Sequence, residues 1–282
     1  MNINRREFFR HSTVFGASAA MVPLLFCDQS GGHKLKNFGF IAGIIGKELK
    51  ADWQAALSQA ASLGFTEYEG GLQGESPAVF LDFCRQIGLK PVAGGITFSE
   101  DMDAVKQSYE RVLALDMPYG VTYWPWFSGG PFTLEECKKS ADVLNQMGEL
   151  ANDMGLTLCW HNHDKEFFEM EEGLPFDYLM ENTDPNLVQC EMDIYWVKKG
   201  GGDPLAVLKQ YAGRFPILHV KDMAAGEDQD FACPGSGIID FAPIFAEATR
   251  QGIQHYFVER DNVSDGMACL ETSSEYLRNL RF

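Results

Sequence analysis

Four short apolar runs in the second half of the chain each end in a residue type that commonly binds metals. The terminal residues are His161, Asp193, His219 and Glu259, and each run has the length and composition of a buried β-strand. In a (β/α)8 barrel the carboxyl ends of all strands meet on one face, where such enzymes carry their active site. Ligand-type residues at consecutive strand ends therefore predict a barrel with a metal site on that face.

Short apolar runs alternate with longer amphipathic segments from Lys36 onward, which is typical of repeated βα units. We predict an α/β fold, a single-domain (β/α)8 TIM barrel over residues 36–282, because such barrels take about 250 residues. The predicted strands are 38–44, 65–69, 90–94, 119–124, 156–161, 187–193, 215–220 and 254–259. The predicted helices are 52–63, 76–87, 101–115, 133–154, 176–181, 204–211, 241–250 and one from about 264.

The chain is strongly acidic, with a formal net charge of −17. A surface that binds nucleic acid needs clustered positive charge, so this balance argues against a nucleic-acid partner. It also argues against adsorption to an anionic membrane surface. Solubility alone explains the acidity. The expected partner is a small molecule, a sugar or keto-sugar, and the oligomeric state stays open.

Residues 1–27 resemble an export signal, and we expect them to lie outside the folded domain. Arg5 and Arg6 form a pair ahead of an uncharged apolar stretch that is too short for an ordinary membrane span. This resembles a twin-arginine signal. Cys27 then precedes polar residues, as at a lipoprotein cleavage site, although the residue before it is larger than such sites expect. We therefore expect an exported protein, periplasmic or lipid-anchored; an ordinary N-terminal helix of a cytoplasmic enzyme is the alternative.

The seven cysteines include no CxxC pair, and their number is odd. Cys159 and Cys190 fall inside predicted buried strands, where cysteine behaves as a small hydrophobic residue. We expect most of the cysteines to be free buried thiols, and we predict no disulfide framework.

Six segments of the C-terminal half, in chain order, are similar to those of the sugar phosphate isomerase/epimerase family, the xylose-isomerase-like TIM barrels. They are His161-Asn-His163-Asp-Lys-Glu166, Glu191-Met-Asp193-Ile-Tyr-Trp196, Gly202-Asp203-Pro204, His219-Val-Lys221-Asp222, Gly235-Ser-Gly237-Ile-Ile-Asp240 and Val258-Glu259-Arg-Asp261. The resemblance covers the chain after about residue 36. It implies a divalent metal at the carboxyl face of the barrel, held by Glu, Asp, His and Glu from the last four strands.

Three of these implied ligands are present as Asp193, His219 and Glu259, whereas His161 stands where many relatives have glutamate. A set of imidazole and carboxylate ligands still suits a divalent metal; we expect Mn or Zn, with Co, Fe or Mg as alternatives. The substitution argues against two symmetric glutamate bases, as used by ketose epimerases of similar fold. His163 is an alternative to His161 as the ligand.

Glu259, Lys221 and His163 are the candidates for catalytic roles. Lys221 would hydrogen-bond a substrate carbonyl oxygen or carry a proton; a salt bridge with Asp222 is the alternative reading. His163 lies two residues beyond His161 and shares its side of a continued strand. We expect it to contact the substrate.

Carboxylates and aromatic residues after several predicted strands are candidates for substrate binding. Glu69 would bind a sugar hydroxyl, or it is a solvated loop charge. The indole of Trp124 would stack on a sugar ring, or it belongs to a hydrophobic lid or to the core. The full set of predicted substrate-binding residues is Glu69, Trp124, His163, Glu166, Trp196 and Lys221.

A metal beside carboxylates and histidines suits proton abstraction next to a carbonyl. Returning the proton to the neighbouring carbon makes an isomerase, returning it to the opposite face makes an epimerase, and expelling a β-substituent makes a lyase. We predict an isomerase or epimerase on an unphosphorylated sugar or keto-sugar. The alternative is a lyase or dehydratase on 3-keto-glycosides or inososes. A non-catalytic periplasmic sugar-binding protein and a phosphodiesterase of the endonuclease IV type are further alternatives, and the acidity disfavours the latter.

Overall fold

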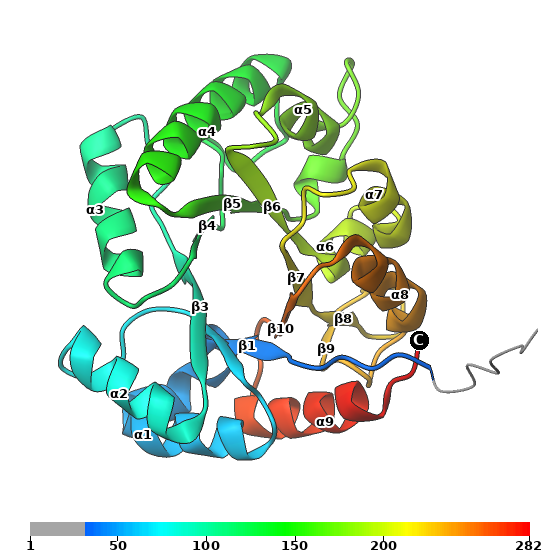
Figure 1. The fold of residues 1–282 in the computed structure, drawn as a ribbon. Coiled ribbons are helices and arrows are strands. Elements are labelled where there is room, and N and C mark those ends of the chain that lie inside the picture. Colours follow the sequence, from blue (N-terminus) through cyan, green and yellow to red (C-terminus); the bar gives the residue numbers. More distant parts are fainter. Residues whose placement is uncertain (1–31) are drawn as a thin grey trace, which may run out of the picture. The chain divides into compact units, whose positions relative to one another are not determined.

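Eight parallel strands close into a barrel with helices around it (Figure 1), in a computed structural model that describes residues 32–282. The strands pair in chain order, and the last of them, β10, closes the ring by pairing with β1. The predicted TIM barrel is confirmed. The strands are β1 (Gly39–Ile41), β2 (Glu67–Glu69), β3 (Lys90–Gly95), β4 (Tyr119–Thr122), β5 (Thr157–His161), β6 (Val188–Asp193), β7 (Ile217–Val220) and β10 (His255–Val258).

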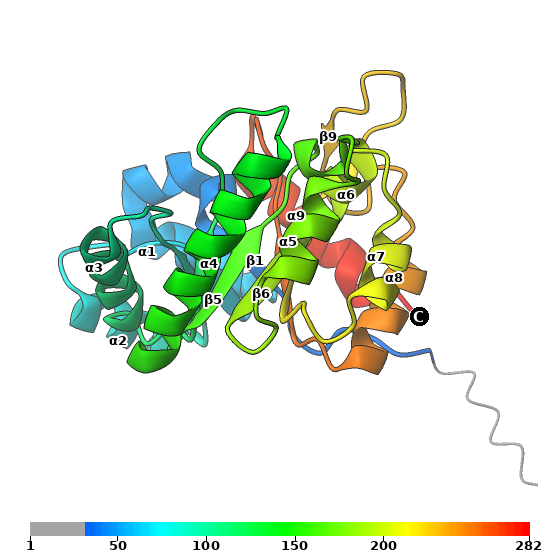
Figure 2. The ribbon, with the colours of Figure 1, turned by 90° about the horizontal axis from the view of Figure 1, so that it is seen from above.

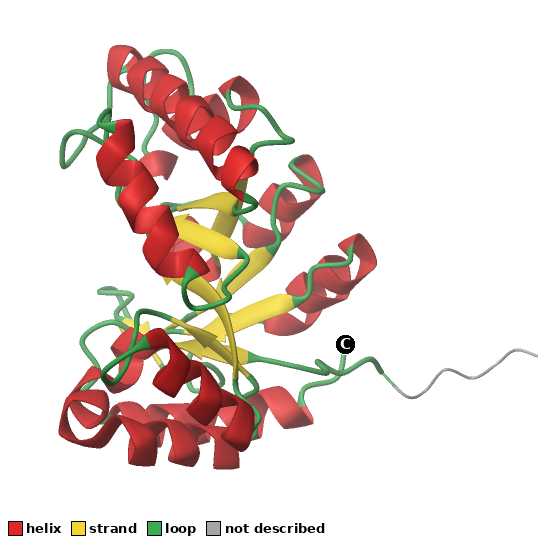
Figure 3. Cartoon of the chain, turned by 60° about the vertical axis from the view of Figure 1, so that its left-hand side comes forward, coloured by secondary structure: helices red, strands yellow, loops and turns green. Residues whose placement is uncertain are grey.

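Helices follow the barrel strands and cover the outside of the barrel, as Figures 1 and 3 show. They are α1 (Gly46–Ser62), α2 (Pro77–Ile87), α3 (Met102–Leu113), α4 (Leu134–Met154), α5 (Pro175–Asn182), α6 (Ile194–Lys199), α7 (Pro204–Gln210), α8 (Phe241–Gln251) and α9 (Gly266–Asn279). The ends match their sequence signals. Thr133 caps α4 by accepting a hydrogen bond from the Glu136 N–H, and Gly155 ends it at φ 77°, a conformation that glycine adopts without strain.

The first strand is shorter than predicted. It ends at Ile41, and residues Ala42–Ile45 form a 3-10 turn, η1. Ile44 and Ile45 are both buried. Adjacent residues of a strand point to opposite faces, whereas a tight turn places both side chains in the core.

Two elements near the carboxyl face were not predicted. Helix α6 begins directly after β6 because the Asp193 carboxylate accepts a hydrogen bond from the Trp196 N–H and so caps it. A two-stranded antiparallel sheet joins β8 (Asp222–Met223) to β9 (Phe231–Ala232), and the chain between them rises above the barrel in Figure 2.

The predicted export signal, including Arg5, Arg6 and Cys27, lies outside the described residues. Within residues 32–282, no helix combines the length and apolar character needed to cross a lipid bilayer.

Cys233 and Cys269 form a disulfide bond, a pairing that the sequence analysis did not predict. They lie 36 residues apart, and only the fold brings the segment after β9 against α9. The other described cysteines are free and buried, as expected.

Reduction of this disulfide should lower the unfolding free energy by about 2–4 kcal/mol, because the bond restricts the unfolded chain. Thermal melts with and without dithiothreitol measure the effect. A Cys233→Ser/Cys269→Ser double variant serves as the control and should melt at the same temperature in both conditions. A wild-type melting temperature that does not respond to reductant would contradict the prediction.

Candidate metal centre

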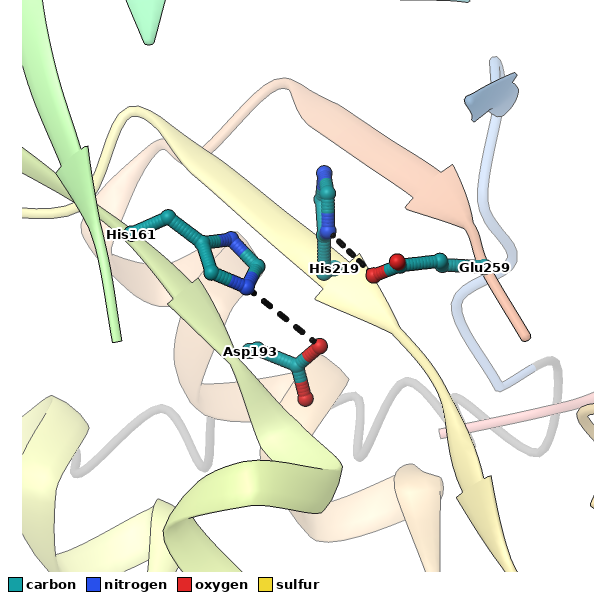
Figure 4. A group of neighbouring side chains, drawn as sticks. All are labelled: His161, Asp193, His219 and Glu259. Carbon is teal, nitrogen blue, oxygen red and sulfur yellow. Dashed lines mark hydrogen bonds and ion pairs between the residues drawn. The ribbon is translucent and has the colours of Figure 1, made fainter. Parts of the chain in front are cut away.

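The structure brings the four predicted ligands together at the carboxyl end of the barrel strands (Figure 4). His161 and Asp193 end β5 and β6, His219 lies in β7, and Glu259 directly follows β10. The register of neighbouring strands explains this meeting, since Asp193 pairs with His219 across β6 and β7. One potential ligand atom from each residue lies within 4.8 Å of the other three.

The polar atoms of this group fit a bound cation. His161, Asp193 and His219 are buried, and Glu259 is only 16% exposed. Asp193 Oδ2 is buried and accepts no hydrogen bond among residues 32–282; its charged neighbours are Lys221 Nζ at 3.3 Å and the His161 ring, with Nε2 at 3.8 Å. A buried carboxylate oxygen is costly to leave unpaired, and a divalent ion would satisfy it. The donor set of two imidazoles and two carboxylates suits Zn or Mn.

The two ligand histidines have opposite electrostatic surroundings. Burial and the neighbouring His219 lower the pKa of His161 well below its ordinary value. Burial would also lower the pKa of His219, but the carboxylates of Glu191, Glu69 and Glu259 raise it well above its ordinary value. This part of the site therefore favours positive charge, whether it is carried by a proton or by a metal ion.

Lys221 places a buried ammonium group beside the ligand carboxylates. Its Nζ lies 3.3 Å from Asp193 Oδ2, 3.2 Å from Glu259 Oε2 and 2.7 Å from Asp261 Oδ2. These three carboxylates outweigh the effect of burial and raise the pKa of Lys221. Lys221 therefore stays charged at neutral pH.

Lys221 does not form the salt bridge with Asp222 that was the alternative prediction. The Asp222 carboxylate instead accepts hydrogen bonds from the backbone N–H groups of Gly235, Gly237 and Ile239. It thus holds the glycine-containing segment against β8. This leaves the Lys221 ammonium directed to the carboxylates at the site.

His163 lies between two aromatic rings beside the ligand group. Its ring centroid is 5.2 Å from that of Trp124 and 5.3 Å from that of Trp196. Burial and the nearby Lys221 lower the pKa of His163 to about 4, so the imidazole is neutral at pH 7. Its Nδ1 atom is buried and has no hydrogen-bond partner in the described part of the chain.

Glu166, a predicted substrate contact, is fully buried and organises the loop that carries His163. One carboxylate oxygen accepts from Trp126 Nε1 at 2.7 Å, and the other accepts from the His163 N–H at 3.1 Å. Both oxygens are engaged within the protein, so its role here is to hold the loop. Burial raises the pKa of Glu166 to about 7.

The raised pKa of Glu166 predicts a pH-dependent stability. Because the folded protein binds this proton more tightly than the unfolded chain, the contribution is complete below about pH 4.5 and is lost as pH rises through 7. The unfolding free energy of the wild type should therefore fall by up to about 3 kcal/mol relative to Glu166→Gln across this range. Denaturant melts of both proteins at several pH values measure the difference. Parallel pH profiles would disprove the assignment.

Glu69, the last residue of β2, is not the solvated loop charge that was the alternative interpretation. It has no exposed surface; one carboxylate oxygen accepts from Tyr123 Oη at 2.6 Å, and the other lies 3.0 Å from His219 Nε2. It therefore lies buried inside the barrel, in contact with the ligand His219.

Glu191 lies beside Glu69, and the sequence analysis predicted no role for Glu191. Its position two residues before Asp193 on β6 was the available signal, since alternate residues of a strand share a side. Burial and the neighbouring Glu69 raise the pKa of Glu191.

A family model of the xylose isomerase-like TIM barrel matches residues 57–280. The chain belongs to this family. The resemblance drawn from the C-terminal motifs is thereby confirmed. Two of the solved structures that share its fold illustrate the likeness. A sugar phosphate isomerase/epimerase from Parabacteroides distasonis has a TM-score of 0.75 at 23% identity, covering 91% of this chain and 98% of that one. The IolI protein, solved with a zinc atom, has a TM-score of 0.68 at 18% identity, covering 87% and 99%.

Among the curated relatives, an inosose dehydratase from Clostridium beijerinckii is 34% identical over 130 residues, which is 40% of this chain and 43% of that protein. The chain spans about half the length of the curated relatives it matches. A second curated relative, an inosose dehydratase from Geobacillus thermodenitrificans, is 32% identical over 151 residues, which is 48% of this chain and 50% of that protein.

Proposed function

We propose that this protein is a metal-dependent lyase that removes a proton next to a carbonyl and expels a β-substituent, as in the dehydration of an inosose or the cleavage of a 3-keto-glycoside. The observation that carries the proposal is a single unengaged imidazole, His163, beside the ligand group. The inosose dehydratases among its relatives and the zinc atom in IolI support the same chemistry.

The residues of the site have complementary roles in this reaction. His161, Asp193, His219 and Glu259 would hold a divalent metal, which would supply Lewis acidity toward a carbonyl group. The Lys221 ammonium donates a hydrogen bond to the oxygen on which negative charge develops. His163 is neutral and takes the proton from the α-carbon. The same proton then leaves with the departing hydroxyl group as water, so the elimination needs one base.

Elimination fits this arrangement better than epimerisation. An epimerase that delivers the proton to the opposite face needs a second base across the substrate. His161 stands at the family's usual glutamate position, and its two ring nitrogens face Glu191 at 2.9 Å and Asp193 at 3.8 Å. It is therefore not free to act as that second base.

An isomerase or epimerase remains the second candidate, and the structural likeness to a sugar phosphate isomerase/epimerase favours it. An isomerase, like a lyase, needs only one base, since it can return the proton on the same face. The two candidates share their first step and differ in the product.

The test is incubation of metal-loaded protein with a panel of inososes, 3-keto-glycosides and ketoses in D2O, followed by NMR. We expect loss of the α-proton signal and the appearance of an unsaturated product. Exchange of the α-proton with a rearranged sugar as product would replace the lyase with an isomerase or epimerase. No exchange in any of these substrates would refute the shared first step.

We also propose that the protein is exported. The paired arginines motivate this, and the Cys233–Cys269 disulfide is of a kind that persists in oxidising compartments. Replacing Arg5 and Arg6 with lysine should leave the protein in the cytoplasmic fraction, while the wild type appears in the periplasmic or membrane fraction. Cytoplasmic retention of the wild type would contradict export.

A further inference from the structure

One buried carboxylate contacts both histidines of the ligand group from inside the barrel. Oε2 of Glu191 lies 2.9 Å from Nδ1 of His161 and 3.2 Å from Nε2 of His219. Glu191 has no exposed surface, and its other oxygen has no partner among residues 32–282. We propose that Glu191 is a positioning residue, which holds both histidines in the tautomers in which they bind the metal.

The directions of these contacts specify the two tautomers. A carboxylate accepts hydrogen bonds, so the ring nitrogens that face Glu191 carry the hydrogens. His161 Nε2 lies 3.8 Å from Asp193 Oδ2, beyond hydrogen-bond distance, and is therefore free to bind an ion. His219 Nδ1 lies 2.8 Å from Oε2 of Glu259, itself a ligand, so an ion bound between these two atoms would take the place of the proton that they share without metal. His161 therefore binds through Nε2 and His219 through Nδ1.

The role of Glu191 is particular to a chain that has a histidine at residue 161. A glutamate ligand at that position would bring its own negative charge to the metal. Here the Glu191 carboxylate stands behind the imidazole, where it orients the ring and increases the basicity of the ligand nitrogen. His219 has a second partner in Glu69, at 3.0 Å, so His161 depends more strongly on Glu191.

This inference rests on the proposed function only in requiring a bound divalent ion. The experiment removes metal from the full chain with a chelator and measures Co²⁺ and Zn²⁺ affinity by competition with a chromophoric chelator. Glu191→Gln should bind both metals about 10–100-fold more weakly than the wild type, and the visible absorption spectrum of bound Co²⁺ should change. Both imidazoles contact the same oxygen, Oε2, so glutamine can still offer them an acceptor, but it lacks the negative charge that raises the basicity of the ligand nitrogens.

Glu67→Gln is the matched control. Glu67 is also a buried carboxylate that contacts a histidine, with Oε2 3.0 Å from His255 Nδ1, but this pair lies at the amino-terminal ends of β2 and β10. The metal affinity and Co²⁺ spectrum of Glu67→Gln should equal those of the wild type. If the wild type and Glu191→Gln bind the metals equally well, the role of Glu191 is overturned and the proposed function stands. If the wild type binds neither metal, both the role of Glu191 and the proposed function are overturned.

Nitrogen-15 NMR of the Zn²⁺-loaded wild type tests the tautomers without any substitution, so it does not depend on the folding of a variant. We expect the ring hydrogen on Nδ1 of His161 and on Nε2 of His219. A ring hydrogen on the other nitrogen of His161 would overturn the assignment to Glu191 even if the metal binds tightly.

Discussion

Glu259→Gln should reduce the rate of α-proton exchange in the metal-supplied protein roughly 10³-fold or more. The substitution removes a charged ligand of the metal group, and Lewis-acid stabilisation of developing charge is worth several kcal/mol. Treatment of the wild type with a chelator should cause a similar loss, and added Mn²⁺ or Zn²⁺ should restore the activity. The measurement is the loss of the α-proton NMR signal in D2O, with a member of the panel of inososes, 3-keto-glycosides and ketoses that the wild type deprotonates.

A matched control distinguishes loss of the metal from loss of a surface charge. Glu275 is an exposed glutamate on α9, and Glu275→Gln should keep the wild-type rate. His219→Ala should behave as Glu259→Gln does. Full activity in Glu259→Gln or His219→Ala, or activity that resists complete removal of metal, would refute the site assignment.

Lys221→Met should have two separable effects. Turnover should fall roughly 10²–10³-fold, because the variant lacks the donor to the developing oxyanion. The metal-free protein should also lose about 3–5 kcal/mol of unfolding free energy, because Asp193 then remains buried without a partner cation and Glu259 keeps only His219. Metal loading should restore much of this stability without restoring turnover, since the ion neutralises the same carboxylates.

Lys199→Met is the control for this prediction. The Lys199 ammonium donates to the backbone carbonyl of Asp228 on a half-buried surface, with no carboxylate partner within salt-bridge distance among residues 32–282. Loss of the Lys199 ammonium should lower the unfolding free energy by less than about 1 kcal/mol. Denaturant melts with and without Zn²⁺ measure all these stabilities. A Lys221→Met protein that is as stable as Lys199→Met in the absence of metal would contradict the ion-pair geometry.

Local patterns predicted most of the barrel and its helices. Strands β5, β6 and β7 lie within their predicted ranges, because buried parallel strands are continuous apolar runs bounded by turn residues. Helix α6 was missed because its start depends on a single side chain, Asp193, that also belongs to the site. Residues Ala42–Ile45 were misassigned because an apolar run does not distinguish a strand from a buried turn.

The sequence by itself determined the family, the barrel and the four residues at the strand ends, since each of these depends on the spacing of residues along the chain. Only the tertiary structure placed Glu69 and Glu191 beside His219, Lys221 among three carboxylates, and Cys233 against Cys269. These contacts join residues that are distant in the chain. The stagger of the strands around the closed barrel sets which side chains lie at the same level, and no local pattern records that stagger.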